Sequence, residues 1–398
     1  MIKVADSKYF HFAKEQIRTS LIQRDVNMYF DRGLWKNLAA TGFFKLRASA
    51  NPAAGESSQL LELISAFKDL GRGGLDIPLT VSAVAQAITV DLVRKFGNET
   101  QRVSYLENLV NGNYIGSICN SEAGAGTNIR GIRSNIQITG KQMGKMQIEK
   151  RGATNLSDAD LMFCSAWKNE VDKKPSLEVF VLERSDAVQT HLVDKLAGFY
   201  TGLTGSALMQ TENFNITNRQ LGEGKLGFSI LKHCFNLERI FITAVITGVL
   251  EGLVQEAMTF ACATSPTGTR LADNQYIQDK IIEVFSTACK LSGMLSEITS
   301  HKGISSEDLV HFTPFLSVMK TTTITDAGNA LLSFYEVFGF PSFTTSHVAQ
   351  KVLRDHMAMR FLGGSKEQQK IILFDELSNA ILGVGKEKSE KKNVEKSA

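Results

Sequence analysis

The sequence lacks the paired cysteines and histidines that mark disulfide frameworks and zinc sites. Its five cysteines, Cys119, Cys164, Cys234, Cys262 and Cys289, lie far apart and form no CxxC pair. Its seven histidines show no HxH or HxxxH spacing, so we expect no metal site. Unpaired cysteines fit a reducing compartment, and we expect the protein in the cytoplasm.

The sequence also lacks a charge excess and any uninterrupted apolar run of membrane-spanning length. Its 44 Lys and Arg residues against 41 Asp and Glu residues give a net charge of +3. The tail 386–398 supplies +2 of this, from five Lys and three Glu, and we expect it to be disordered or a frayed helix. Nucleic-acid binding and membrane insertion are therefore not expected.

What the sequence does contain is a change of periodicity along the chain. Apolar residues recur at helical spacing up to about residue 118, alternate in β-branched stretches over 119–222, and return to helical spacing over 223–385. This order predicts an α+β protein: an N-terminal helical domain (1–118), a middle β-sandwich or barrel (119–222), a C-terminal helical bundle (223–385) and a charged tail (386–398). Expected strands are 134–138, 161–166, 177–182 and 207–216, and expected helices are 228–264, 273–298, 305–338 and 344–359.

A glycine-rich turn stands where the first helical part meets the strands. In this turn, at residues 122–128, Gly124 and Gly126 carry no side chain, and Ser121 and Thr127 place hydroxyls beside them. Such a turn lets a flat ligand lie close to the backbone. Because helices, strands and helices follow one another without βα alternation, we do not interpret the turn as a Rossmann fingerprint.

Several motifs in sequence order resemble those of the acyl-CoA dehydrogenase family. They are FGNETQ at 96–101, YLENLVNG at 105–112, SEAGAGTN at 121–128, ATNLSDAD at 153–160, LGEGKLGF at 221–228, NLER at 236–239 and LRD at 353–355. The resemblance covers roughly residues 5–385. It implies an N-terminal helical domain, a middle β-domain and a C-terminal four-helix bundle that also forms a tetramer.

The resemblance implies FAD-dependent oxidation of an acyl thioester to its α,β-enoyl form. A carboxylate removes the α-proton while the flavin accepts a hydride from the β-carbon. Much of the family carries this base as Glu in a YEGT motif, where this sequence has Gly363. Isovaleryl-CoA dehydrogenase-like members carry it in an LER sequence instead, which here supplies Glu238.

The residue pattern around Glu238 agrees with that assignment. Steps of three and four place it on one stripe with Phe235, Ile242 and Val245, so the carboxylate should project from an apolar ridge. Burial there should raise its pKa towards neutral, as a general base requires. The structural alternative is a buried Glu238 paired with an arginine such as Arg239.

The resemblance also implies roles for other residues. The N–H of Gly363 and a ribityl hydroxyl would form the oxyanion hole. Cofactor contacts fall on Ser121, Gly126, Thr127, Thr154, Gln275, Gly339 and Ser365, and substrate contacts on Thr127 and Arg239. Expected partners are an acyl-CoA or acyl-carrier-protein substrate, electron-transferring flavoprotein or oxygen as the electron acceptor, and further copies in a homotetramer or homodimer.

Departures from the family pattern leave a second hypothesis open. Gly152 replaces an aromatic residue that shields the flavin, and Glu336 replaces a Gln near the pyrophosphate. Thr264 and Thr267 replace the Arg and Phe of the adenosine clamp. The alternative is therefore a protein of this family that has lost flavin and dehydrogenation and acts as a non-redox catalyst or a structural subunit.

Overall fold

The computed structural model describes residues 6–48, 55–124, 129–186, 189–192, 205–222, 224–266, 268–300, 309 and 311–382. Its α-helices are α1 (Lys8–Phe12), α2 (Leu21–Asn27), α3 (Arg32–Ala40), α4 (Gly55–Gly74), α5 (Ile77–Phe96), α6 (Glu99–Val110), α7 (Gly227–Cys262), α8 (Gln275–Ser300), α9 (Thr313–Val337), α10 (Val348–Ala358) and α11 (Lys366–Leu382). Its strands are β1 (Gly116–Cys119), β2 (Asn135–Ile138), β3 (Met143–Arg151), β4 (Leu161–Asn169), β5 (Ser176–Glu183), β6 (Gln189–Leu192), β7 (Gly205–Asn215) and β8 (Gln220–Leu221). The predicted order of helices, strands and helices is confirmed.

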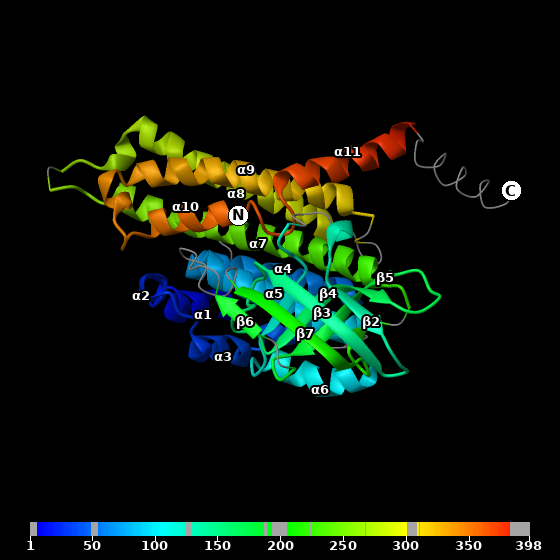
Figure 1. Ribbon diagram of the computed structural model, residues 1–398. Coiled ribbons are helices and arrows are strands. Elements are labelled where there is room, and N and C mark those ends of the chain that lie inside the picture. The colour runs from blue at the N-terminus through cyan, green and yellow to red at the C-terminus, as the bar shows by residue number, and fades with distance from the viewer. Residues whose placement is uncertain are drawn as a thin grey trace.

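The helices and the sheet are arranged in layers (Figure 1). The long helices α7, α8, α9 and α10 run side by side along one side, and the sheet and α6 lie on the other. Helices α4 and α5 lie between them and pack against α7. Helix α9 begins at Thr313, later than the predicted start at 305, and α11, β3, β6 and β8 were not predicted as separate elements.

The strands of the middle region form one eight-stranded sheet in the order β6-β7-β3-β2-β4-β5-β8, with β1 also paired to β4. Alternate residues of β4 pack into two different hydrophobic cores, one on each face of the sheet. Leu161 and Phe163 pack into the core shared with the helices, whereas Met162 and Cys164 pack into a core of the sheet's own. The sheet is therefore tied to the helices through one face, and the end of β1 is held beside them.

Local sequence signals explain where the helices beside the sheet begin. The Asp76 carboxylate accepts a hydrogen bond from the N–H of Leu79 at the start of α5, where Pro78 occupies the first turn. Asn98 and Gln101 form a reciprocal capping box at the start of α6. Among the described helices, only α5 is long and apolar enough to cross a membrane, and 94% of that apolar window is buried inside the protein.

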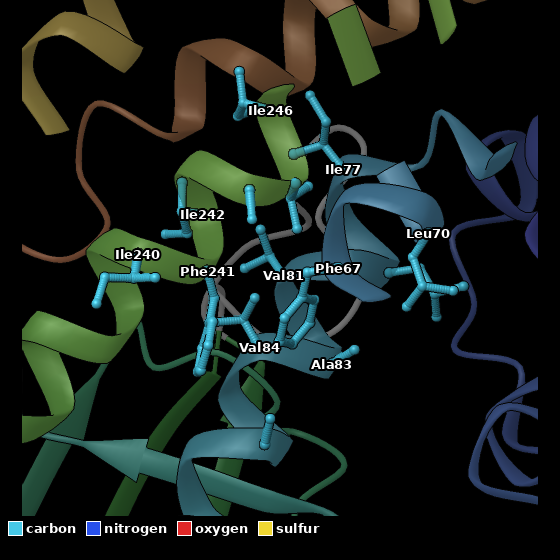
Figure 2. Close-up of a cluster of buried hydrophobic side chains, with 14 of the residues drawn as sticks. Phe67, Leu70, Ile77, Val81, Ala83, Val84, Ile240, Phe241, Ile242 and Ile246 are labelled. Atoms are coloured by element: carbon cyan, nitrogen blue, oxygen red, sulfur yellow. The ribbon is translucent and has the colours of Figure 1, made fainter. Parts of the chain in front are cut away.

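Helices α4 and α7 cross at very short range, which fixes the position of α7. A Cβ added at Gly71 would lie 2.3 Å from the carbonyl oxygen of Val245, and one at Gly248 would lie 1.9 Å from that of Lys68. Only glycine allows this approach. Figure 2 shows the adjoining core, in which the rings of Phe67 and Phe241 lie 4.9 Å apart between α4 and α7.

Candidate active site

One cavity of about 190 Å³ lies where the sheet, α5, α7 and the start of α11 meet. Its walls are apolar over much of their extent, with Val81, Val84 and Ile88 from α5 and Ile118 from β1. Its polar lining comes from the end of β1, the turn between β3 and β4, the first half of α7 and the start of α11. It comprises Asn120, Ser121, Thr154, Glu238, Arg239, Gln368 and Gln369. The structure therefore brings Ser121, Thr154, Glu238, Arg239 and Gly363 of the predicted site into one cavity.

Glu238 reaches this cavity from α7 and has no local partner. Its neighbours Leu237 and Arg239 are buried, and within the described residues its carboxylate makes no hydrogen bond or ion pair. Arg239 donates instead to Asn236 Oδ1 at 2.9 Å, so the predicted alternative of a Glu238–Arg239 ion pair is not what the described residues form. An acidic group without a partner in an apolar cavity is unusual unless it has a function.

Gly363 faces that carboxylate from the turn between α10 and α11. Its φ is +63°, a conformation that side chains rarely adopt. A Cβ built on it would lie 3.3 Å from Glu238 Oε2. Glu238 therefore fills the space into which a side chain at position 363 would grow, and this is a physical reason why only one of the two positions carries a carboxylate.

The following residues hold this turn in place. Gln369 Nε2 donates to the carbonyl oxygen of Gly363 at 3.1 Å, and the Ser365 hydroxyl accepts from the N–H of Gln368 at 3.3 Å. Ser365 thereby caps the start of α11. Within the described residues the N–H of Gly363 has no acceptor, so it is free to donate into the site.

The electrostatics of the site rest on the half-buried carboxylate of Glu238 and on buried cations. Burial raises the pKa of Glu238 above its ordinary value, while Lys320 and Arg239 act in the opposite direction. Burial also lowers the pKa of Arg239 to about 10, although Glu238 opposes this. The Nε atom of Arg239 is buried without a hydrogen-bond partner within the described residues, which leaves a donor for a ligand.

The wall opposite α7 is made of small residues and hydroxyls. Gly152 and Ala153 present little side chain, and Gly152 has a φ of +68° in the turn after β3. The hydroxyls of Ser121 and Thr154 make no hydrogen bond within the part of the chain that the structure describes. The predicted site residues Gly126 and Thr127 lie outside the described residues.

A buried ion pair anchors the entry to the glycine-rich turn. Glu122 accepts from Lys150 Nζ at 2.6 Å and from the N–H of Arg133 at 2.6 Å. Lys150 is wholly buried. Asn120, directly before Ser121, accepts from the Ser165 hydroxyl at 2.7 Å. These bonds fix Asn120, Ser121 and Glu122 against the sheet, and Lys150 was not predicted as their partner.

Two predicted cofactor residues lie away from the cavity. Gln275 begins α8 and Gly339 follows the end of α9, and neither lines the cavity. Near them, Glu336 forms an ion pair with Lys280. The carboxylate that replaces the family's Gln is therefore compensated by a cation of the same chain.

Lys320 on α9, which was not among the predicted site residues, is wholly buried. A usable signal existed. Between residues 313 and 335 the only charged residues are Lys320 and Asp326, and Lys320 lies on the apolar face of the helix.

Comparisons with known proteins agree with this architecture. The sequence model of the acyl-CoA dehydrogenase N-terminal domain matches residues 7–113, and that of the C-terminal domain matches residues 225–377. An acyl-CoA dehydrogenase of Bacillus subtilis is 22% identical over 325 residues, 80% of this chain and 83% of that protein. The mitochondrial isovaleryl-CoA dehydrogenase of Pongo abelii is 23% identical over 65% of this chain and 62% of that protein.

Solved structures share the fold. A prolyl acyl carrier protein oxidase superimposes with a TM-score of 0.82 at 23% identity, covering 93% of this chain and 97% of that one. Butyryl-CoA dehydrogenase from Megasphaera elsdenii superimposes with a TM-score of 0.81 at 19% identity, covering 94% of this chain and 99% of that one. The resemblance predicted from the motifs is confirmed, and the chain belongs to the acyl-CoA dehydrogenase family, whose members are FAD-dependent oxidoreductases acting on CH–CH bonds.

Proposed function

We propose that the protein catalyses FAD-dependent α,β-dehydrogenation of an acyl thioester with Glu238 as the base. The observation that carries this proposal is the Glu238 carboxylate, which lines an apolar cavity, has no partner among the described residues and fills the space in front of Gly363. A carboxylate in an apolar cavity loses part of its hydration, which makes it more basic. It is therefore suited to accept a proton from a substrate.

The residues of the cavity fit a flavin ring. The small residues Gly152 and Ala153 leave room for a flat group, and the hydroxyls of Ser121 and Thr154 are available as hydrogen-bond donors. Gly126 and Thr127 would complete this wall, as the family resemblance implies. Bound FAD would supply the acceptor for the hydride that leaves the β-carbon.

The protein's own residues would carry the proton step. Glu238 would take the α-proton, and the N–H of Gly363 would donate to the thioester oxygen as negative charge develops on it. The apolar side chains of Val84 and Ile118 would keep water from the reacting atoms. Arg239, whose Nε has no partner among the residues that the structure describes, is available to bind the thioester's carrier.

A basic groove supports a phosphate-bearing carrier, either coenzyme A or a carrier protein. This groove, of about 650 Å³, lies at the α5–α6 junction, the β4–β5 hairpin and the start of α7. Its cations are Arg102, Lys168, Lys173, Lys174 and Lys225, against the carboxylates Glu170 and Glu178. Lys225 lies two residues before α7, the helix that carries Glu238.

A second copy of the chain would explain the remote cofactor residues. Gln275 and Gly339 do not line the cavity of their own chain, and a neighbouring subunit would allow their predicted contact with FAD. Exposed apolar side chains on α11, among them Ile371, Phe374 and Ile381, offer a surface for such a neighbour. A homotetramer or homodimer accounts for both features.

The test is the cofactor and its chemistry. Purified protein is expected to be yellow, with FAD identified by mass spectrometry, and its flavin absorption is expected to bleach when an acyl thioester is added without oxygen. A panel of acyl-CoA and acyl-carrier-protein thioesters would then identify the substrate. Colourless protein that binds no added FAD would contradict the proposal and favour a non-redox or structural role.

A further inference from the structure

Gln369 on α11 carries a buried hydrogen-bond acceptor that none of the described residues uses. Its side chain lines the cavity of the candidate site, and the residue is only 1% exposed. Its Nε2 donates to the carbonyl oxygen of Gly363 at 3.1 Å. Because a carbonyl can only accept, this bond also determines which end of the amide is the nitrogen. The other end, Oε1, is buried and has no hydrogen-bond partner within the described residues.

Two other buried glutamines of this chain have amides that are satisfied at both ends. Gln86 donates through Nε2 to two backbone carbonyl oxygens at 2.8 Å each, and its Oε1 accepts from the N–H of Gly116 at 2.8 Å. Gln101 also donates to two carbonyl oxygens, and it accepts from the N–H of Asn98 at 3.0 Å. Buried polar atoms are rarely left without a partner, so the unused acceptor of Gln369 indicates a ligand that supplies the donor.

The cavity offers a ligand one unused buried acceptor and one unused buried donor. Among the described residues that line it, the buried polar atoms without a partner are Gln369 Oε1 and Arg239 Nε. Since each lacks any partner, the two atoms do not bond to each other. A hydrocarbon acyl chain that fills the cavity would leave Gln369 Oε1 unpaired and shut off from water, which weakens binding.

The unused oxygen lies beside the Gly363 turn, close to the place where the proposed function puts the thioester. Nε2 and Oε1 belong to one planar amide, and the nitrogen is held by the Gly363 carbonyl. In the proposed function the N–H of the same glycine donates to the thioester oxygen. A substrate donor that reaches Gln369 therefore belongs to the first carbons of the acyl chain and not to its far end.

We propose that Gln369 is a specificity-determining residue whose Oε1 accepts a hydrogen bond from a hydroxyl or amino group near the thioester end of the acyl chain. This inference rests on the proposed function, and it narrows the substrate class from acyl thioesters in general to hydroxyacyl or aminoacyl thioesters. A site built around a substrate donor rejects the analogue that lacks it, because the buried acceptor is then left unpaired.

The experiment measures binding and bleaching with sets of ligands that differ by one donor. The binding probes are S-butyl-, S-(2-hydroxybutyl)- and S-(2-aminobutyl)-pantetheine, titrated calorimetrically into the protein with FAD added. These thioethers lack the carbonyl group and so have no acidic α-proton to lose. The bleaching probes are the matching butyryl, 2-hydroxybutyryl and 2-aminobutyryl thioesters, added without oxygen. The parent protein is expected to bind a donor-bearing probe at least about tenfold more tightly than the butyl probe.

Two variants test whether the preference comes from the acceptor or from the bond to the turn. Gln369→Met loses both ends of the amide, so we expect it to bind the probes alike. Gln369→Glu keeps an acceptor oxygen, so we expect it to retain the preference. Gln16→Met is the matched control, because Gln16 also uses its amide in one bond, from Asn37 Nδ2 at 3.1 Å, but is exposed and outside the cavity lining. Its preference should equal that of the parent.

A parent protein that binds the probes equally, or favours the butyl probe, would overturn the inference whether or not the variants fold. An unchanged preference in Gln369→Met would also overturn it, and weaker FAD binding in that variant would then show that Oε1 serves the flavin. Loss of the preference in both variants would assign it to the turn and contradict the inference too. The two proposals fail separately: a binding preference without bleaching contradicts only the proposed function, and bleaching without a preference contradicts only this inference.

Discussion

Two clusters of buried charge in this protein are built in opposite ways. The first joins α2, α5 and α10 with three cations and three carboxylates, Arg24, Lys351, Arg354, Asp25, Asp76 and Asp355. The second, at the cavity, consists of Glu238, Arg239 and Lys320, and no two of them form an ion pair within the described residues.

The clusters differ at Asp76 and Glu238, although in the paired cluster burial still raises the pKa of Asp355 against Lys351 and Arg354. Burial would raise the pKa of Asp76, yet Lys351 and Arg24 hold it below its ordinary value. At the cavity burial prevails, and the pKa of Glu238 is raised although Lys320 and Arg239 oppose it. A fully paired cluster fixes helices in place, whereas an unpaired one keeps a carboxylate that can accept a proton.

The largest expected effect on stability is the difference between replacing the buried lysine of the first cluster and replacing that of the second. Lys351→Met would leave Asp76 and Asp355 buried without their shared cation, at a cost of about 3 to 5 kcal/mol in the free energy of unfolding. Lys320→Met loses one hydrogen bond and removes an unpaired charge, so we expect a change within about 1 kcal/mol. Urea unfolding of both variants at pH 7 measures the difference, and equal losses would contradict the distinction between the clusters.

A smaller effect should appear on acidification through His356, which lies between the clusters. Its Nε2–H donates to the carbonyl oxygen of Ile324 at 3.1 Å, and burial lowers its pKa to about 4. An unfolded chain takes up this proton as the pH falls below about 6.5, but the folded protein does not until about pH 4, so stability is lost between those values. The loss is on the order of 3 kcal/mol at pH 4.

His356→Gln removes that titration while retaining a donor for Ile324. Its melting temperature should therefore fall less between pH 7 and pH 4.5 than that of the parent protein. An equal fall in the two proteins would show that other groups cause the acid sensitivity.

A change at Gly363 tests the contact with Glu238 directly. Gly363→Ala should cost about 1 to 2 kcal/mol of stability because of its positive φ, and its methyl group should press on Glu238 and slow bleaching about tenfold. Gly42→Ala is the matched control, with a φ of +82° and no atom within 4 Å of the added Cβ. If both variants bleach at the parent rate, the close approach of Gly363 to Glu238 does not matter for catalysis.

The smallest effect is expected on the exposed surface of the bundle. Lys290 and Asp326 form an ion pair of 2.7 Å between α8 and α9. Lys290→Met should change the unfolding free energy by no more than about 0.5 kcal/mol, because solvent and salt screen such pairs. A loss comparable to that of Lys351→Met would mean that burial does not control how much an ion pair contributes to the free energy of unfolding of this protein.

Sequence patterns predicted the order of the domains and much of the cavity, because both depend on local periodicity and short motifs. Glu238 and Gly363 were identified from neighbouring residues in the chain, and the structure places them together. Lys150 was missed because it meets Glu122 across 28 residues of sequence. Lys320 was missed although its place on the apolar face of α9 was a usable signal. The placement of Gln275 and Gly339 away from the cavity could not be predicted either, since it depends on the direction of α8 and α9 after folding.

The measurement that tests the central claim most directly is anaerobic bleaching of the Glu238→Gln variant. Glutamine has nearly the same shape as glutamate but cannot accept the α-proton. We predict that the variant remains yellow and binds the thioester, while its bleaching rate falls by about a thousandfold or more. Bleaching at the parent rate would contradict the account, because the proton would then be taken by another group.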